Sequence, residues 1–152
     1  MKNFSIRLVS KSDKKILFNW TNDSEVRKWS FNQSAITFPN HEVWFDKVTK
    51  DRNIIIFIFE NNNFPTGLVR FKKKNKDEFI LNYLIGPNSR GKGMASIMLK
   101  MTINDIKSYW ENINVFAYTL PDNIASIKSL EKAGFKLFSS NNNKKCYVYA
   151  IK

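Results

Sequence analysis

Long apolar runs, cysteines and histidines are all scarce in this chain of 152 residues. Its one cysteine, Cys146, excludes an internal disulfide framework, and together with a single distant histidine it provides no set of metal ligands. No apolar stretch approaches the length of a membrane span, and residues 1–10 contain no apolar core of a signal peptide. We therefore expect a cytoplasmic protein with no metal and no membrane contact.

Acidic residues are scarce as well. The chain has 13 aspartates and glutamates against 25 lysines and arginines, which gives a formal net charge of +12. Such a charge is typical of proteins that bind a nucleic acid, an anionic membrane or a small acidic ligand. It is also found where charged residues serve only to keep the protein soluble. The basic residues are scattered, and their densest run, Lys72–Lys74 with Lys76, is typical of a solvated turn between strands. No known nucleic-acid-binding pattern accompanies the charge, so we expect no nucleic-acid partner.

The chain does contain enough apolar material for a core, with 43% hydrophobic and 14% aromatic residues. Alternating or continuous apolar segments predict strands at residues 6–9, 53–59, 67–71, 79–85, 113–118, 135–139 and 146–151. Helical spacing predicts helices at residues 13–20, 24–29, 41–50, 93–110 and 123–132, with Ser12, Asp23 and Asn40 as caps of the first three. This order indicates one mixed α/β domain over residues 1–152, with mostly antiparallel strands and one central β-α-β crossover.

The segment 85–95 joins a predicted strand to the longest predicted helix. Main-chain N–H groups at a helix start attract phosphate, and Gly91 and Gly93 allow a bulky anion to approach the backbone. Arg90 and Lys92 add positive charge at the same place. The segment lacks the ending of a P-loop and the third glycine of a dinucleotide fingerprint, but it matches the pattern Arg/Gln-x-x-Gly-x-Gly/Ala at every fixed position. An ordinary glycine-rich turn with a basic cap is the alternative.

Residues 90–95 resemble the acetyl-CoA pyrophosphate loop of the GNAT superfamily of N-acetyltransferases. A second segment, residues 123–135, is similar to that family's Asn-x-x-Ser/Ala…Glu-Lys-x-Gly-Phe ending. The two segments have the family's order and spacing, and the resemblance covers nearly the whole chain. It implies the GNAT fold, which is a mixed, mostly antiparallel sheet with flanking helices, and it implies acetyl transfer from acetyl-CoA to an amine.

The resemblance also implies how acetyl-CoA binds. In the family the two strands that correspond to 79–85 and 113–118 diverge after a bulge, and the pantetheine arm bonds to exposed main chain, here near Leu84 and Ile85. The pyrophosphate is expected on the N–H groups of the following turn, which are those of Arg90, Gly91, Lys92, Gly93, Met94 and Ala95. Asn123 and Ser126 are expected to complete the cofactor site, and Asn123 is also placed to act as a plain helix cap.

Acetyl transfer needs a base for the amine and donors for an oxyanion. Glu78, at the start of the strand 79–85, is the favoured base, and a solvated strand-end carboxylate is its alternative interpretation. His41 is the second candidate base, although it also suits a capping or substrate-contact role at the start of the helix 41–50. The resemblance assigns the oxyanion to the N–H of Ile85.

The proton for the departing thiolate has no assigned source. Many members of the family carry a tyrosine for this purpose at the position where this chain has Leu130. Ser126 or Ser129 with water are the possible substitutes. Unassisted release is also open, because a thiol has a pKa of about 8.5.

The N-terminal segment is similar to acetyltransferases of surface-sugar biosynthesis, notably those that act on nucleotide-linked 4-amino sugars in the pseudaminic-acid pathway. A guanidinium there would bind a diphosphate, and aromatic side chains would stack on a nucleobase or sugar, although the aromatic residues equally suit a helix-packing core. The expected acceptor-binding residues are Arg27, Trp29, Phe31, His41 and Trp44. The alternatives are acetylation of a protein N-terminus, as in ribosomal-protein acetyltransferases, and a CoA-binding module without chemistry. Monomer and homodimer both stay open.

Overall fold

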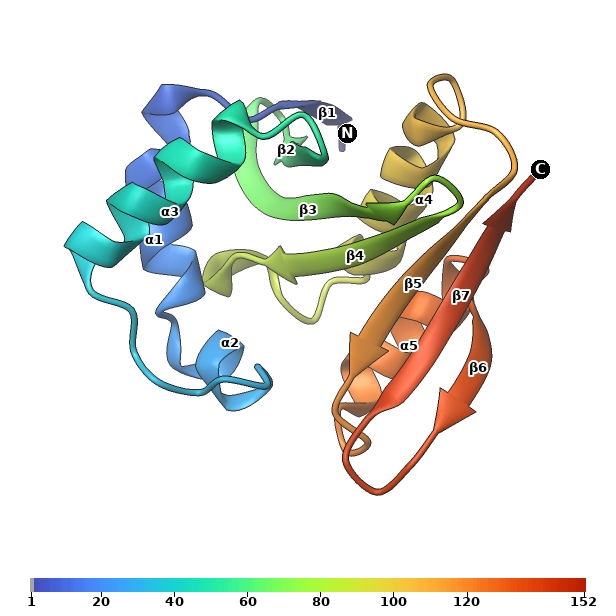
Figure 1. The fold of residues 1–152 in the computed structure, drawn as a ribbon. Coiled ribbons are helices and arrows are strands. Elements are labelled where there is room, and N and C mark those ends of the chain that lie inside the picture. Colours follow the sequence, from blue (N-terminus) through green and yellow to red (C-terminus); the bar gives the residue numbers. More distant parts are fainter. Residues whose placement is uncertain (1) are drawn as a thin grey trace.

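The computed structural model describes residues 2–152, whose strands form a seven-stranded sheet in the order β1-β2-β3-β4-β5-β7-β6 (Figure 1). The strands are β1 (Phe4–Leu8), β2 (Ile54–Asn61), β3 (Phe64–Asn75), β4 (Glu78–Ile85), β5 (Ile113–Thr119), β6 (Lys136–Ser140) and β7 (Lys145–Ile151). All neighbouring strands are antiparallel except β4 and β5, which are parallel. The predicted fold, mixed and mostly antiparallel with one central crossover, is therefore confirmed.

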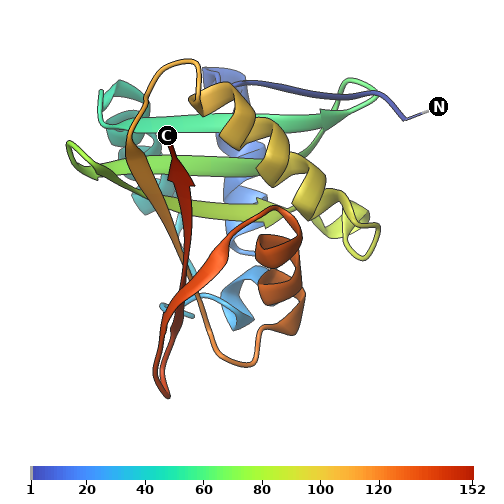
Figure 2. The same ribbon diagram turned by 90° about the vertical axis from the view of Figure 1, so that its right-hand side faces the viewer.

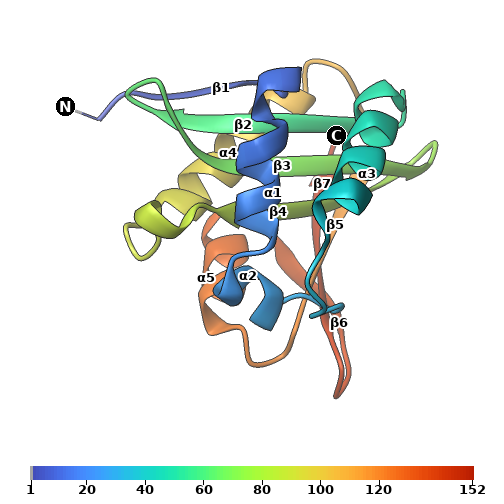
Figure 3. The same ribbon diagram turned by 90° about the vertical axis from the view of Figure 1, so that its left-hand side faces the viewer.

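Helices cover both faces of the sheet. Figure 2 shows α4 and α5 on one face, and Figure 3 shows α1 and α3 on the other. The helices are α1 (Lys14–Thr21), α2 (Ser24–Lys28), α3 (Phe38–Lys50), α4 (Met94–Ile106) and α5 (Ile124–Lys132). Short 3-10 turns at Lys11–Asp13 and Pro87–Ser89 lie before α1 and α4. Within residues 2–152, no helix has the length and apolarity that a bilayer crossing requires.

Two of the three predicted helix caps are wrong. Ser12 lies inside the first 3-10 turn, whose cap is Ser10. Asn40 lies in the first turn of α3, because the side chain of Thr37 accepts a hydrogen bond from the Asn40 N–H and the fixed φ of Pro39 suits the start of a helix. The helix therefore begins three residues earlier than predicted, and its histidine lies one turn inside it. The third cap, Asp23, is confirmed, since its carboxylate accepts from the N–H of Glu25.

The core has two parts, one on each face of the sheet. The larger part lies between the sheet and α4 and α5, and it includes Leu130 and Met98, both fully buried. The smaller part holds α1 and α3 against the sheet through Leu17, Phe45 and Ile58. Helices as short as α1 are marginal by themselves in water, so this packing supplies most of their stability. The helical wall over β2–β4 is thus fixed by tertiary contacts.

The two central strands separate part-way along their length, and we call this divergence the fork (Figure 1). Only Glu78–Leu81 of β4 pairs with β5, at residues 114–117. The rest of β4 continues alongside β3, while β5 continues alongside β7. The predicted divergence is confirmed, but the predicted bulge before it is absent, because the register of β3 and β4 is continuous from Phe79 to Ile85. Beyond the fork, β4 therefore stays in the sheet through β3 alone, and β5 through β7 alone.

The lysine run also differs from its prediction. β3 extends to Asn75, so Lys72–Lys74 form the exposed end of a strand, and only Lys76 lies in the turn that follows. The side chains are solvated as expected, because the end of this hairpin projects beyond the helices that cover the sheet.

Candidate functional site

A cavity of about 480 Å³ opens at the fork, and we call it the fork cavity. Nine of the ten predicted cofactor-binding residues line it: Leu84, Ile85, Arg90, Gly91, Gly93, Met94, Ala95, Asn123 and Ser126. The tenth, Lys92, lies outside the cavity wall, because its ammonium group donates to the carbonyl of Asn88 at 3.1 Å. The fold thus brings together two segments that lie far apart in the sequence.

The start of α4 has the form of an anion site. Gly91 and Gly93 have φ angles of +72° and +73°, in the left-handed region that favours glycine, and a Cβ added to either would meet nothing within 4 Å. Gly93 precedes the first helical residue, and its lack of a side chain leaves the N–H groups of the first turn without a side-chain cap. Those N–H groups and the helix dipole favour a negatively charged ligand.

Arg90 is paired with a protein carboxylate. Its Nη2 lies 2.6 Å from Oδ2 of Asp23, the residue that caps α2. Burial opposes ionisation of Asp23, but Arg90 and the main-chain N–H groups of Val26 and Glu25 together outweigh it, so the pKa of Asp23 lies below its usual value. The Arg90 side chain therefore ties the loop before α4 to the start of α2, and part of its charge is neutralised.

The α5 side of the fork cavity carries hydroxyl and amide groups. Asn123 accepts a hydrogen bond from the N–H of Ser126 at 3.2 Å, so it caps α5 while it also lines the cavity. The Ser126 hydroxyl lies 2.6 Å from the hydroxyl of Tyr83, which comes from β4. Leu130 is completely buried in the core, so no hydroxyl replaces the family's usual tyrosine at that position.

Tyr83 is a residue of this site that the sequence analysis missed. It lines the fork cavity, and burial raises its pKa to about 12, against the opposing effect of its hydrogen bond to Ser126. The alternation along β4 puts Tyr83 on the same side as Phe79 and Leu81. That pattern indicated only a core-facing aromatic residue, and the partner on α5 depends on the tertiary fold.

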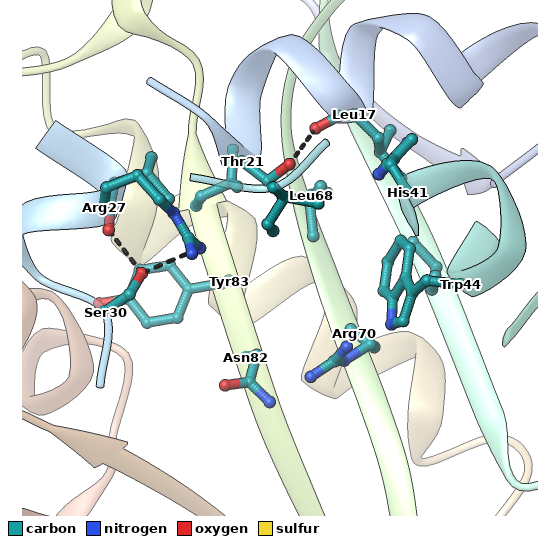
Figure 4. A pocket seen from close by; sticks show the side chains of 14 residues that line it. Leu17, Thr21, Arg27, Ser30, His41, Trp44, Leu68, Arg70, Asn82 and Tyr83 are labelled. Carbon is teal, nitrogen blue, oxygen red and sulfur yellow. Dashed lines mark hydrogen bonds between the residues drawn. The ribbon is translucent and has the colours of Figure 1, made fainter. Parts of the chain in front are cut away.

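A second cavity, of about 290 Å³, lies between β2–β4 and the wall of α1–α3, and we call it the helix-side cavity (Figure 4). Three predicted acceptor-binding residues, Arg27, His41 and Trp44, line it. The other two, Trp29 and Phe31, line the fork cavity instead. The two cavities share Val26, Ser30, Asn82, Tyr83 and Leu84, so they meet at the open part of β4.

Arg27 is occupied by protein oxygens, contrary to its predicted role. Its Nη1 donates to the carbonyls of Asn32 and Ser34 at 2.9 and 3.1 Å, and its Nη2 donates to the hydroxyl of Ser30 at 3.3 Å (Figure 4). The guanidinium therefore holds the loop between α2 and α3 in place. The prediction of two parallel bonds to a diphosphate is not supported, because the donors that it requires are already used by the loop.

His41 is almost fully buried, at 1% exposure, and its ring centroid lies 5.6 Å from that of Trp44. Its Nε2 lies 2.8 Å from the carbonyl oxygen of Lys14. A carbonyl only accepts, so Nε2 carries the hydrogen and the neutral ring leaves Nδ1 able to take up a proton. The ring also links α3 to α1, which gives it a structural role.

Glu78 lies away from both cavities. Its carboxylate accepts a hydrogen bond from Asn75 at 3.0 Å and lies 3.8 Å from the ammonium of Lys74. About 23 Å of strand separate it from Ile85, at the opposite end of β4. The structure thus fits the interpretation of Glu78 as a solvated strand end and does not bring it to the site.

Arg70 is a second residue that the sequence analysis missed. It lines the helix-side cavity from β3, and its guanidinium lies over the ring of Trp44, 5.7 Å from the centroid (Figure 4). Burial lowers its pKa from the usual arginine value. The alternation of the strand 67–71 puts Arg70 on the same face as Leu68, so a lone arginine on an otherwise apolar strand face was the available signal.

No metal centre appears among residues 2–152, where no three histidine, cysteine, aspartate or glutamate side chains gather closely enough to hold an ion. Cys146 is buried and lines neither cavity, and burial raises the pKa of its thiol. It therefore packs as a core residue of β7.

The acetyltransferase (GNAT) domain family matches residues 3–136. A spermidine N-acetyltransferase from Vibrio cholerae, solved with CoA and spermine, has a similar structure, with a TM-score of 0.85, 18% sequence identity, and 97% of this chain and 95% of that chain covered. A domain from Methanocaldococcus jannaschii gives a TM-score of 0.84 at 23% identity, with 99% of this chain and 100% of that chain covered.

An aminoglycoside acetyltransferase in complex with coenzyme A gives a TM-score of 0.80 at 17% identity, with 97% of this chain and 95% of that chain covered. None of the curated protein sequences matches the chain. At these identities the structural likeness shows the fold, and the match over residues 3–136 shows the family.

Proposed function

This chain belongs to the GNAT acetyltransferase family and is an N-acetyltransferase, and we propose that it transfers the acetyl group of acetyl-CoA to the amine of a nucleotide-linked amino sugar. The observation that carries this proposal is the meeting of two cavities at Tyr83 and Leu84, one at the fork and one under the helices. Binding the two substrates on either side of the open part of β4 would orient them toward each other, and this orientation would supply much of the rate acceleration. We treat residues 1–152 as one catalytic domain.

The fork cavity suits acetyl-CoA. Beyond Leu81, the edge of β4 that faces away from β3 has no strand beside it, so its main-chain groups can bond to a pantetheine amide. The N–H groups that begin α4 suit the pyrophosphate, with Gly91 and Gly93 leaving open space beside them. The spermidine and aminoglycoside acetyltransferases of this fold were solved with coenzyme A, which supports the assignment.

Acetyl-CoA supplies an acetyl group activated as a thioester, and the protein positions it and handles protons. The N–H of Ile85, the last residue of β4, is our proposed donor to the oxyanion. Of the two candidate bases, His41 lines the helix-side cavity and has a free Nδ1 in its neutral form, whereas Glu78 lines neither cavity. We therefore favour His41 as the base.

The acceptor side suits a sugar that extends beyond the protein surface. The helix-side cavity is lined by apolar side chains such as Leu17, Ile56 and Leu68, together with polar groups such as Thr21, Ser30 and Asn82. Phe31 is 57% exposed at the mouth of the fork cavity, beside Trp29, where an aromatic face can stack on a nucleobase. A sugar ring would occupy the cavity and the attached nucleotide would lie along these aromatic residues.

The test is a thiol-release assay with acetyl-CoA and a panel of acceptors, namely UDP-linked amino sugars, peptides with free N-termini, and polyamines. We expect thiol release with the nucleotide-linked sugars. Thiol release with the peptides alone would replace the sugar with a protein N-terminus. Acetyl-CoA binding without thiol release from any acceptor would favour a CoA-binding module without chemistry.

A further inference from the structure

The guanidinium of Arg70 is partly buried and, among residues 2–152, has no oxygen partner at the site. Arg70 stands between Ile56 of β2 and Asn82 of β4 in the sheet register, on the face covered by α1 and α3. Its Nε is buried and has no hydrogen-bond partner among residues 2–152. Figure 4 shows its side chain in the helix-side cavity, between Trp44 and Asn82.

The other partly buried arginines are all paired with oxygen atoms. Arg7 contacts two carboxylates, Arg90 contacts one, and Arg27 donates to two carbonyls and a hydroxyl. For Arg70, no carboxylate of residues 2–152 lies within 4.0 Å, and no hydrogen bond to a protein oxygen is present in that part of the chain. Its guanidinium instead lies over the aromatic face of Trp44.

This arrangement is costly unless a ligand completes it. Partial removal of a guanidinium from water without an anion is unfavourable, and a cation–π contact offsets only part of the loss. A planar guanidinium matches the two oxygens of a carboxylate or phosphate, so such a group would supply the missing partner.

The composition of the cavity wall points the same way. The residues lining the helix-side cavity include two arginines, Arg27 and Arg70, and no aspartate or glutamate. An acceptor with several positive charges would meet two like charges there and no opposite one. An acceptor with an oxyanion would find Arg70 available.

We propose, building on the acetyltransferase function above, that the acceptor is an amine that also carries an oxyanion, a carboxylate or a phosphate, and that Arg70 binds this oxyanion in the helix-side cavity. The anion would be held on β3, so that the amine of the same molecule reaches the open part of β4 at Leu84. The chain is therefore selective against polyamines and aminoglycosides, although enzymes for both share its fold.

The first experiment needs no activity. Thermal melts of wild type, Arg70→Gln and the control Arg52→Gln, which removes an exposed arginine, are recorded with phosphate, with a sugar phosphate and with an amino-sugar carboxylate. We expect these anions to raise the melting temperature of wild type and Arg52→Gln by similar amounts, and to raise that of Arg70→Gln less, because the anion site at the start of α4 remains in all three proteins. Acetyl-CoA should stabilise all three proteins equally. Equal anion effects in all three proteins would overturn the assignment of Arg70.

The second experiment compares acceptors in matched sets: a neutral amino sugar, its phosphate, the corresponding amino-sugar carboxylate, and spermidine. Arg70→Gln should raise KM for whichever oxyanion-bearing acceptor is used by wild type about 30-fold or more, with little change in kcat. KM for the neutral amino sugar should rise far less than KM for the oxyanion-bearing acceptor. The phosphate and carboxylate arms identify the source of the anion.

These results separate the two proposals. A protein that binds no acetyl-CoA contradicts the proposed function itself. A protein that acetylates amines, but prefers spermidine, or loses all acceptors equally on Arg70→Gln, contradicts only the role of Arg70. In that last case Arg70→Lys, which keeps the charge and the packing of the stem, would restore activity for every acceptor alike.

Discussion

The hydroxyl of Tyr83 on β4 lies 2.6 Å from the hydroxyl of Ser126 on α5, so one hydrogen bond spans the fork at the point where the two strands have separated. Strand pairing no longer connects β4 to the β5–α5 unit there. The width of the fork cavity therefore depends on side-chain contacts of this kind.

We expect Tyr83→Phe and Ser126→Ala each to lower the stability of the protein by about 1 kcal/mol, because each leaves one hydroxyl without its partner. The double variant should lose less than the sum of the two, since both changes break one bond. Urea unfolding of the four proteins measures this coupling. Simple additivity would mean that the hydroxyl groups do not interact.

Gly93→Glu should weaken acetyl-CoA binding about 100-fold or more, because it points a carboxylate at the expected position of the pyrophosphate. Isothermal titration calorimetry measures this. Gly93→Ala is the matched control: its Cβ fills part of the open space but adds no charge, so it should weaken binding much less than Gly93→Glu, with a strain cost of about 1 kcal/mol in stability from the left-handed φ. Unchanged affinity in a folded Gly93→Glu variant would place the pyrophosphate elsewhere.

His41→Gln should lower kcat roughly 100-fold or more if the imidazole removes the amine proton. The glutamine amide can still donate to the Lys14 carbonyl, so the link between α1 and α3 is kept while the proton-accepting Nδ1 is lost. The rate should recover partly at high pH, where free amine is abundant.

Glu78→Gln is the companion variant, and we expect a pH–rate profile like that of wild type, since Glu78 lines neither cavity. A large loss with Glu78→Gln and none with His41→Gln would restore the original assignment of the base.

Asp13→Asn should lower the free energy of unfolding by about 2 kcal/mol at neutral pH, because it breaks a partly buried, bidentate ion pair with Arg7 (2.8 and 2.9 Å). Hydrogen bonds from Arg7 hold the Asp13 pKa below its usual value. The stabilisation is therefore complete above the pKa that Asp13 has in the unfolded state. It disappears as the pH falls through the lower pKa that Asp13 has in the folded state.

Thermal melts from neutral to acidic pH should show that the difference in melting temperature between wild type and Asp13→Asn becomes smaller as the pH falls. Asp46→Asn, in an exposed pair with Lys14, should change little at any pH. A gap that is independent of pH would mean that Asp13 acts through its shape and not its charge.

Local signals in the sequence predicted those parts of the site that depend on neighbouring residues. Gly91 and Gly93 have the left-handed φ that a glycine-rich turn requires, and the helix after them follows at once. Asn123 caps α5 as its position indicated. In each case the chain within a few residues determines the conformation, so the pattern carries the necessary information.

Other features depend on strand register and packing, which short patterns do not contain. Glu78 was favoured because of its strand, but its end of β4 is the one closed against β5. Arg27 was expected to bind a ligand, yet the loop it holds folds back onto it. The strand pattern marked Arg70 and Tyr83 only as side chains on particular faces of β3 and β4, and their neighbours in the cavities depend on the tertiary fold.

The contact between Asp23 and Arg90 joins the two halves of the site through a single ion pair. A pyrophosphate that attracts Arg90 would withdraw it from Asp23, and Asp23 is also the residue that anchors the first turn of α2. Since Val26 and Arg27 of α2 form part of the wall of the helix-side cavity, a ligand in the fork cavity would change the shape of the helix-side cavity. We therefore expect steady-state kinetics with an obligatory order of binding, in which acetyl-CoA binds before the acceptor.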